Sequence, residues 1–435
     1  MRLTFKLLLA ALTAAPALGN PLPAPQAGMR RWIVSFNPAV KRAGREADLA
    51  ALGVEAAAHI ATDGNTDNEF SAAVVDLPAG QALTDPAAGS GDIVSIEPDR
   101  RIVKIDQAAV SFQATPFGAG LGGFVFPKAG QYPLPKAAEF PRNAARLAAM
   151  SVHPEIRWNI NRVHAPAAWD MTEGCDKDGD CVKVAIIDTG IDSNHPDLVG
   201  KVDGGYSAIT KTEKPADYQD DNGHGTHVSG TVAALRDGKG VVGVAPKARL
   251  YAVKVLDSDG SGELSDVIDG LVWAAKNGMQ IANLSLGSPS DSAALHRAVR
   301  YAKGCGVIIV AAAGNANGGA VAFPAAYPEV IAVAASDADD QFASFSSRGP
   351  QVKFIAPGAD IVSDKLGGGL IAHDGTSMAA PHVAGLAALA MAQGAVGLTG
   401  PDGVLAALKK AAKKLPGLSD DEQGFGMIDA GKLTH

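Results

Sequence analysis

Short apolar runs alternate with amphipathic stretches from about residue 151 to the end of the chain. The runs have the length and composition of strands buried on both faces of a sheet, and they lie at Val182–Ile187, Leu250–Leu256, Ile281–Leu284, Val307–Ala312 and Val330–Ala335. Helical spacing occurs between them, as at Leu264–Asn277 and Ser292–Lys303. This alternation predicts an α/β fold in which helices cover both sides of a parallel sheet and ligands bind beyond the carboxyl ends of its strands.

The residues before this region follow a different pattern. From about Arg31 to Asp106 we expect strands at Trp32–Phe36, Ser71–Leu77 and Ile93–Ile96, and a helix near Gly44–Ala58, which together make a small α+β unit. Residues 107–150 are rich in Ala, Pro and Gly and have no sustained periodicity, so we interpret them as a linker. The chain is therefore predicted to fold as two parts.

The first residues are typical of a secretory signal peptide. Arg2 and Lys6 precede the apolar stretch Leu7–Leu12, and small residues follow at Ala17 and Gly19. A membrane anchor is the weaker alternative, because a span needs about 20 apolar residues. We therefore interpret residues 1–19 as the signal peptide of an exported protein, extracellular or periplasmic, with no later membrane span.

Length and charge narrow the function classes. The 435 residues allow roughly two to four domains, and the net charge of −8 gives no overall attraction to nucleic acid or anionic membranes. The basic segment Leu408–Leu415 is interpreted as a solvated helix face rather than a nucleic-acid site. By default we expect a monomer.

Three segments carry residues suited to acyl transfer. Asp188 follows the apolar run that ends at Ile187, His224 lies between two glycines ahead of an apolar stretch, and a turn of small residues delivers Ser377 to the start of a long helix. A serine hydroxyl becomes a nucleophile when a base takes its proton and a carboxylate orients that base. We expect Pro381 in the first helical turn, where proline is tolerated. Taken singly, a strand-end Asp is more often a cap or turn residue, a Gly-flanked His is usually an ordinary loop residue, and a helix-start Ser is usually an N-cap.

Together the segments resemble the subtilisin-like serine proteases, the subtilase family. The resemblance rests on Asp188-Thr-Gly-Ile-Asp with His195-Pro-Asp197, on His224-Gly-Thr-His-Val-Ser-Gly-Thr and on Asp374-Gly-Thr-Ser377-Met-Ala-Ala-Pro-His-Val-Ala-Gly, in the family's Asp, His, Ser order. It covers most of residues 151–435, the predicted peptidase domain, and implies a three-layer doubly wound sheet. It also implies Ser377 as nucleophile, His224 as general base and acid, Asp188 as orienting carboxylate and Asn315 as oxyanion donor.

The same resemblance implies a peptide-binding cleft. The edge strand would include Ser285, Leu286 and Gly287, and the facing wall of the pocket before the scissile bond would be Ala312, Ala313 and Gly314, with Ala322 near its floor. These small residues, without an acidic one, predict a broad endopeptidase that prefers apolar or aromatic side chains. A tripeptidyl-type exopeptidase and a non-catalytic peptide-binding or inhibitory module are the alternatives.

A structural calcium ion is a further implication of the family. The loop Leu235–Pro246 has the matching length, and the expected ligands are Asp197, Leu235, Asp237, Lys239 and Val241. Two departures are the charge of Lys239 and the presence of Pro154 and Glu155 where the family offers a glutamine amide. The alternative is a solvated acidic loop.

The cysteines and the remaining metal-like motifs are interpreted separately. Asp176, Asp178 and Asp180 resemble an EF-hand loop, but the required Gly and Glu are replaced by Cys181 and Ile187. We predict instead a disulfide between Cys175 and Cys181, with Cys305 as a free packing residue. His224 and His227 lack the His-Glu-x-x-His pattern of a zinc site.

The N-terminal α+β unit resembles the inhibitor-type prosegment of many subtilases, so residues 20–106 are predicted to form one. Such a segment assists folding and blocks the cleft until the enzyme cleaves itself, which implies a zymogen. The linker at 107–150 is longer than the usual junction, so the mature N-terminus is expected anywhere from about Asp106 to Ile156, in one or two steps. A separate binding domain is the alternative.

Overall fold

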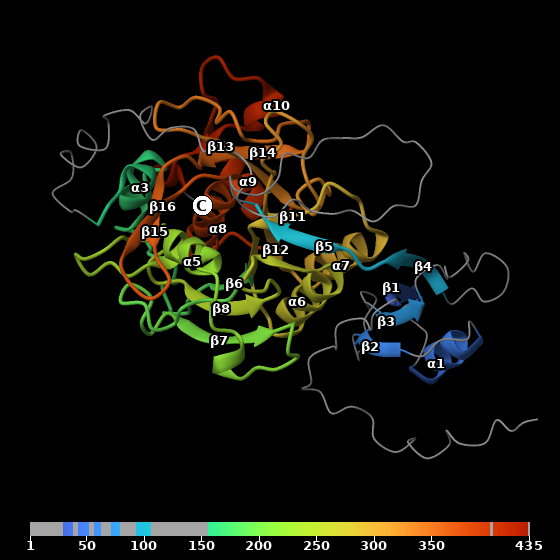
Figure 1. Ribbon diagram of the computed structural model, residues 1–435. Coiled ribbons are helices and arrows are strands. Elements are labelled where there is room, and N and C mark those ends of the chain that lie inside the picture. Colours follow the sequence, from blue (N-terminus) through green and yellow to red (C-terminus); the bar gives the residue numbers. More distant parts are fainter. Residues whose placement is uncertain are drawn as a thin grey trace, which may run out of the picture.

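A computed structural model describes residues 29–37, 42–51, 56–61, 71–78, 93–105, 155–400 and 403–433. It has a large α/β part and a smaller N-terminal unit beside it (Figure 1). The predicted signal peptide, the whole of the predicted linker at 107–150 and the start of the predicted peptidase domain lie outside the described residues.

A seven-stranded parallel sheet forms the centre of the large part, in the order β14-β13-β12-β10-β6-β8-β7. The strands are β6 (Lys183–Asp188), β7 (Val202–Ser207), β8 (Arg249–Lys254), β10 (Ile281–Leu284), β12 (Ile308–Ala312), β13 (Ile331–Ser336) and β14 (Val352–Pro357). The five predicted apolar strands are confirmed to within one or two residues. The two outermost strands were not predicted, because Val202–Ser207 contains two glycines and Val352–Pro357 contains a lysine and a proline.

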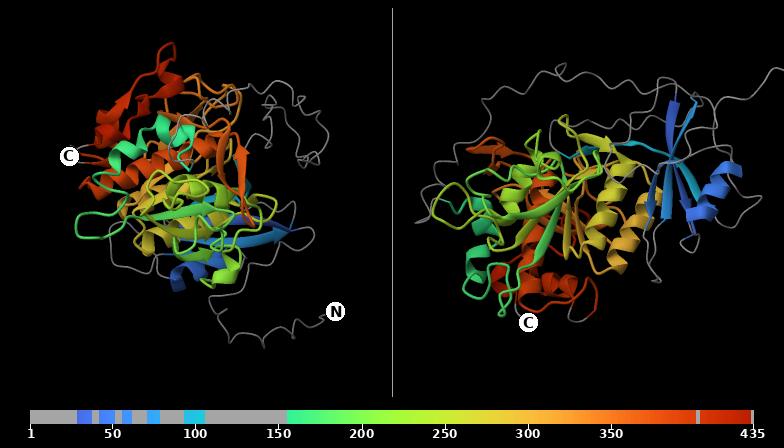
Figure 2. Two further views of the ribbon diagram at one scale, coloured as in Figure 1. Left: turned by 90° about the vertical axis from the view of Figure 1, so that its left-hand side faces the viewer. Right: turned by 90° about the horizontal axis from the view of Figure 1, so that it is seen from below.

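Helices cover both faces of the sheet, which confirms the three-layer prediction (Figures 1 and 2). Side chains alternate along each strand, so Ile186 packs in the core under α5 (His224–Ala233) and α8 (Thr376–Ala392), whereas Ile187 packs under α6 (Leu264–Lys276) and α7 (Ala293–Gly304). Both cores are apolar and deeply buried.

The chain order reverses between β6 and β10, which are neighbours in the sheet. Beyond the carboxyl ends of parallel strands, such a reversal leaves a crevice that commonly holds a ligand. Asp188 ends β6, and Ala312 ends β12 on the far side of β10. The candidate catalytic residues therefore gather beyond the carboxyl ends of the central strands.

The N-terminal unit is a four-stranded antiparallel sheet with one helix, in the order β2-β3-β1-β4. Its elements are β1 (Met29–Phe36), α1 (Arg42–Ala51), β2 (Ala56–Ala61), β3 (Ser71–Pro78) and β4 (Ile93–Pro98). The expected helix Gly44–Ala58 was too long: it ends at Ala51, and its last residues belong to strand β2. The sequence contains Gly53 at this point, and glycine is a common helix stop.

The unit packs against α6 and α7, beside which it stands in Figure 2. Ile33, Ala72 and Val74 from its sheet share one apolar core with residues of both helices. After β4 the chain crosses to the large part as β5 (Arg101–Lys104). There β5 lies between β11 (Leu286–Gly287) and β9 (Ser261–Glu263) and pairs antiparallel with both.

The remaining elements are short and complete the edges of the large part. They are α3 (Trp158–Arg162), α4 (Ala165–Ala168), η1 (Pro215–Asp217), β15 (Ile361–Asp364), β16 (Leu370–His373), α9 (Val404–Ala411), β17 (Ala412–Lys413), α10 (Asp420–Gln423), β18 (Met427–Ile428) and η2 (Ala430–Lys432). The predicted basic helix at Leu408–Leu415 therefore ends at Ala411, where the chain turns into β17. None of the described helices is long and apolar enough to cross a membrane.

Candidate active site

Asp188 and His224 form the buried centre of the site. The Nδ1 atom of His224 lies 2.8 Å from Asp188 Oδ1, and both side chains are almost fully buried. The same carboxylate oxygen accepts a hydrogen bond from the backbone N–H of Thr189 at 2.7 Å. The contact assigns the proton of a neutral His224 to Nδ1, because a carboxylate accepts, and leaves a lone pair on Nε2.

A buried carboxylate, Asp220, shapes the turn that presents His224. Its Oδ1 accepts from the Thr189 hydroxyl at 2.8 Å and from the backbone N–H of Gly223 at 2.9 Å, and its Oδ2 accepts from both the N–H and the hydroxyl of Thr226. These bonds join the turn after β6 to the first turn of α5. Sequence reasoning missed Asp220, since a lone Asp ahead of the His224 motif carries no signal of its contacts.

Ser377 lies in the first turn of α8 and is completely buried. The expectation for Pro381 was wrong: α8 begins at Thr376, so Pro381 falls in its second turn. A proline there cannot donate to the carbonyl four residues earlier, which is that of Ser377. The hydroxyl of Ser285 donates to this carbonyl instead, at 2.8 Å.

Asn315 follows the end of β12 and is oriented by Thr376. Its Oδ1 accepts from the backbone N–H of Thr376 at 3.0 Å and from the Thr376 hydroxyl at 2.9 Å. The Nδ2 of Asn315 is buried and has no hydrogen-bond partner within the described residues. A buried, unpaired amide donor beside the start of α8 is suited to receive negative charge that develops on a nearby oxygen. The role of Thr376 was not foreseen, although it precedes Ser377.

The end of β5 reaches Ser377. The backbone N–H of Ile105 donates to Ser285 O at 3.1 Å, and the hydroxyl of Ser377 contacts the carbonyl oxygen of Ile105. This hydroxyl also lies 2.9 Å from Ser285 O, and among the described residues His224 Nε2 has no partner. The chain segment Arg101–Ile105 thus lies along the edge strand as an extended peptide would, with Ile105 against the serine.

The Ile105 side chain lies against Gly287, one of the residues predicted for the wall of the pocket before the scissile bond. A Cβ atom added to Gly287 would lie 2.8 Å from Ile105 Cδ1 and 3.2 Å from Ala322 Cβ, and one added to Gly314 would lie 3.2 Å from Ala322 Cβ. Ala313 pairs with Ala322 through a backbone hydrogen bond of 2.8 Å. The structure therefore brings Gly287 and Gly314 to opposite sides of Ala322, with Ile105 against Gly287; Leu286 lies in β11 and Ala312 ends β12.

The predicted calcium loop lies against Asp197. Asp197 Oδ2 accepts from the backbone N–H of Val241 at 2.8 Å, and the carbonyl oxygens of Leu235, Lys239 and Val241 accept no hydrogen bond in the described part of the chain. Asp237 is turned toward its own loop, where its Oδ1 accepts from Lys239 N at 3.0 Å. The loop thus offers unpaired carbonyl oxygens and one adjacent carboxylate, which fits a hard cation, but Asp237 does not converge on Asp197 as expected.

Other histidines near the site are buried and structural. His227 Nε2 lies 2.9 Å from Ile361 O, and burial, with the nearby His373, holds the pKa of His227 well below its usual value. Burial lowers the pKa of His382 to about 4, and its Nδ1 lies 2.8 Å from Met378 O. Both imidazoles are therefore neutral at physiological pH.

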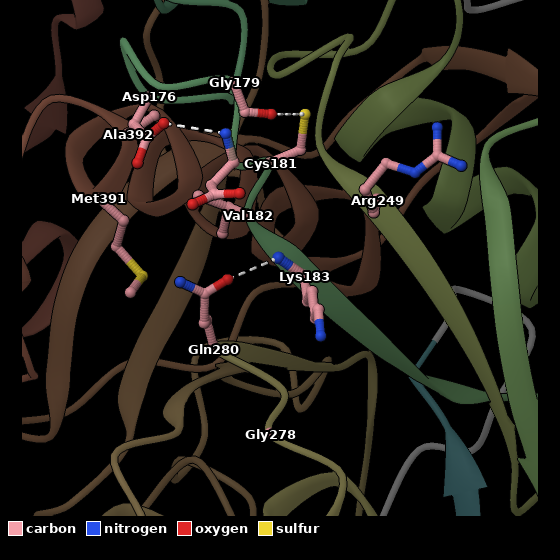
Figure 3. Close-up of a pocket in the computed structure, with 11 residues that line it drawn as sticks. Asp176, Gly179, Cys181, Val182, Lys183, Arg249, Gly278, Gln280, Met391 and Ala392 are labelled. Atoms are coloured by element: carbon pink, nitrogen blue, oxygen red, sulfur yellow. Dashed lines mark hydrogen bonds between the residues drawn. The ribbon is translucent and has the colours of Figure 1, made fainter.

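A disulfide joins Cys175 and Cys181, as predicted. It borders a pocket of about 770 Å³ that lies at the amino ends of β6 and β8, where Lys183 and Arg249 line it (Figure 3). The catalytic candidates lie at the opposite end of the sheet, where its parallel strands have their carboxyl ends. Cys305 is free but exposed, so its interpretation as a packing residue was wrong.

Comparison with known proteins gives matches across this part of the chain. Residues 179–426 match the subtilase family. The chain is 50% identical over 234 residues to M-protease of Shouchella clausii (strain KSM-K16), covering 54% of this chain and 59% of that protein. It is equally similar to Subtilisin Savinase of Lederbergia lenta, of which it covers 83%, and 48% identical over 242 residues to Subtilisin E of Bacillus subtilis (strain 168), of which it covers 61% and which matches 55% of this chain. The match thus spans less than two thirds of M-protease and Subtilisin E.

Proposed function

This chain belongs to the subtilase family, and we propose that it is a serine endopeptidase made as an inhibited precursor that cleaves itself. The observation that carries the proposal is the contact between the Ser377 hydroxyl and the carbonyl of Ile105, the residue that directly follows strand β5 along the cleft. A nucleophile against the carbonyl of an extended peptide is the arrangement from which acylation starts.

In the proposed reaction Ser377 Oγ attacks the carbonyl carbon of the residue before the scissile bond. His224 Nε2 takes the serine proton and then delivers it to the leaving amine, while Asp188 holds the imidazole by its Nδ1–H and stabilises the imidazolium. Asn315 Nδ2 and the backbone N–H of Ser377 donate to the oxyanion. Water, activated by His224, then releases the acyl group by the same steps in reverse.

Self-cleavage would occur between Ile105 and Asp106. Support comes from the position of Ile105, whose carbonyl contacts Ser377 while its N–H pairs with the edge residue Ser285. Cleavage there would make residues 20–105 the prosegment, close to the predicted boundary, and would place the new N-terminus at Asp106. The linker would then begin the mature chain unless a second cut removes it.

The prosegment would remain as an inhibitor because it docks at more than the cleft. The carboxylate of Asp99 accepts from the N–H of Ser265 at 2.9 Å and from its hydroxyl at 2.6 Å, and Glu97 accepts from the N–H of Ala294 at 2.6 Å. These acceptors lie at the starts of α6 and α7, where backbone N–H groups lack helical partners. Cutting after Ile105 removes none of these bonds.

The pocket geometry supports a preference for apolar side chains before the scissile bond. Ile105 is 7% exposed, and its side chain lies against Gly287, which Ala322 also approaches. An endopeptidase is favoured over the tripeptidyl alternative, because Arg101–Ile105 runs through the cleft without a block after three residues. The intact set of Ser377, His224, Asp188 and Asn315 disfavours a non-catalytic module.

We also propose that the Leu235–Val241 loop holds a structural calcium ion. The carbonyl oxygens of Leu235, Lys239 and Val241, with Asp197, would be its ligands, and Asp237 would join by a small rotation of its exposed side chain. The ion would stiffen the segment that follows α5, and the ion itself would take no part in the reaction. Export, and a monomeric protein acting on protein or peptide substrates, complete the proposal.

Labelling with a fluorophosphonate tests the proposed activity. Once the cleaved prosegment has been removed, the protein should be modified once, at Ser377, and lose its hydrolysis of a denatured protein substrate, whereas the Ser377→Ala variant should remain unlabelled. A folded chain without its N-terminal unit that reacts with neither probe nor substrate would support the non-catalytic alternative.

A further inference from the structure

Three buried side chains outside the proposed catalytic set meet between two segments that lead to it. His195 and Asp197 lie in the turn after β6, and Asp364 ends β15. Their exposed fractions are 2%, 6% and 0%, and their candidate ligand atoms all lie within 4.8 Å of one another. Ionisable groups gathered in this way need a compensating charge.

Asp364 supplies the clearest sign that a partner belongs there. Both of its carboxylate oxygens are buried and receive no hydrogen bond from an N–H or hydroxyl group of the described residues; the carboxyl group of Asp197 lies within hydrogen-bonding reach. No Lys or Arg in that part of the chain pairs with Asp364 or Asp197, and a third carboxylate, Asp192, is near. A fully buried carboxylate at Asp364 without a positive partner is costly.

His195 is oriented so that a lone pair faces the two carboxylates. Its Nε2 lies 2.9 Å from the carbonyl oxygen of Gly369, which can only accept, so the ring hydrogen is on Nε2. Nδ1 is consequently unprotonated, and its one lone pair accepts a long hydrogen bond of 3.2 Å from the backbone N–H of Asp197, which a metal ion would have to replace. A carbonyl that fixes the outer N–H of an imidazole is the usual support of a histidine metal ligand.

The spacing also suits a metal ion. His195 Nδ1 lies 3.6 Å from Asp364 Oδ1. Two ligands at the usual bond length of about 2.0–2.1 Å from a tetrahedral zinc ion are about 3.4 Å apart, so this pair needs almost no movement. Calcium and magnesium prefer sites made wholly of oxygen, whereas one imidazole with carboxylates favours zinc or a similar transition metal.

We propose that His195 Nδ1, Asp197 and Asp364 bind one divalent transition-metal ion, with zinc as the probe of choice. This site shares Asp197 with the calcium ion proposed for the Leu235–Val241 loop, so the Asp197 carboxylate would bridge the two ions; His195 and Asp364 belong to this site alone. A water molecule or a bidentate carboxylate completes the coordination.

The ion would fasten together the two segments that position the catalytic residues. The turn bearing His195 and Asp197 continues from Asp188, and the β15–β16 hairpin bearing Asp364 leads to Ser377. At present the two segments are joined by hydrogen bonds such as the one from Gly367 N–H to Asp192 Oδ2 at 2.9 Å. The metal adds a cross-link between the Asp188 and Ser377 segments.

The test measures metal uptake rather than activity. The full chain carrying Ser377→Ala is compared with its Asp364→Asn and Asp237→Asn derivatives. Each protein is stripped of metal with a chelator and dialysed against zinc, and the zinc bound per protein molecule is then measured by elemental mass spectrometry. The parent and Asp237→Asn should each hold about one zinc ion and melt at a higher temperature with zinc. Asp364→Asn, which preserves size and removes the charge, should hold at least about tenfold less.

The stripped proteins provide the control for misfolding. Without metal, Asp364→Asn should melt no lower than the parent, because it removes a buried unpaired acid. If it misfolds, His195→Gln serves in its place and should likewise lose the zinc. The proposal is overturned if the parent takes up no more zinc than these variants, since the two carboxyl groups then share a proton instead.

Discussion

Ser285 donates its hydroxyl hydrogen bond to the backbone carbonyl of Ser377, at 2.8 Å. This carbonyl would normally accept from the residue four positions later in α8, but that residue is Pro381, which has no N–H. The edge strand that receives the peptide therefore also completes the helix that carries the proposed nucleophile. A shift of the edge strand would disturb Ser377 directly.

Replacing Ser285 by alanine should destabilise the folded chain by about 1–3 kcal/mol, because the Ser377 carbonyl would be buried without a donor. The Pro381→Ala variant restores an N–H at the position where the helix needs one. In the Pro381→Ala background, Ser285→Ala should lower the free energy of unfolding by clearly less. Urea unfolding of the two single variants and the double variant, all carrying Ser377→Ala, measures this coupling. Equal costs in both backgrounds would show that Ser285 does not replace the missing helical bond.

Asn315 should act through its Nδ2 donor. Replacing it with alanine should lower kcat by about 10²–10³ with little change in KM, since the donor serves the transition state. Asn315→Asp keeps the Oδ1 acceptor for Thr376 but removes the N–H donor, and it should lose at least as much. Steady-state kinetics on a peptide amide measures both variants. If Asn315→Asp stays fully active, Asn315 only orients Thr376 and is not an oxyanion donor.

Gly287 should set the size of the side chain accepted before the scissile bond. Its Cβ-free surface leaves room for Ile105, and the added Cβ of Gly287→Ala would lie 2.8 Å from Ile105 Cδ1. Overpacking of this kind costs typically about 1–3 kcal/mol, so kcat/KM for a substrate with Phe at that position should fall about tenfold or more relative to one with Ala. The Ala substrate is the internal control. An unchanged ratio of the two values would place the pocket elsewhere.

Asp99 should make the stability of the uncleaved precursor depend on pH. Burial raises its pKa to about 6, whereas an unfolded aspartate titrates near 3.8. Between these values the folded chain holds a proton that the unfolded chain has lost, so the contribution of Asp99 is greatest at and below about pH 4 and declines by up to about 3 kcal/mol as the pH rises to 6.

The Asp99→Asn variant provides the comparison, because asparagine keeps an acceptor oxygen for Ser265 but does not titrate. In the Ser377→Ala background, the stability of the aspartate protein relative to the asparagine protein should fall from pH 4 to pH 6 and then stay constant. Thermal unfolding at a series of pH values measures this difference. A difference that grows as the pH rises would mean that the helix start favours the carboxylate over the acid.

The core of the fold could be predicted because its strands are uniformly apolar. Ile281–Leu284 is buried on both faces, and its boundaries were predicted without error. Val202–Ser207 was not, since a strand at the edge of the sheet tolerates glycines and polar residues that weaken the pattern. Helix α1 was extended too far, because an alanine-rich stretch suits a helix and here continues into strand β2.

The candidate catalytic residues could be located because each lies in a long motif at the end of a predicted strand or the start of a helix. Contacts between distant segments could not be read in the same way. Nothing in the sequence around Asp364 indicates that it meets His195, and nothing around Ile105 indicates that its carbonyl meets Ser377. Such pairs are fixed by how the hairpin and the N-terminal unit pack, which no local pattern encodes.

Intact mass and N-terminal sequence of the purified precursor, followed over time beside Ser377→Ala, test the central claim most directly. Our account predicts that only the unsubstituted chain is cut and that its new N-terminus is Asp106. The claim is contradicted if both folded precursors persist, or if both are cut alike at the same bond, because cleavage would then not depend on Ser377.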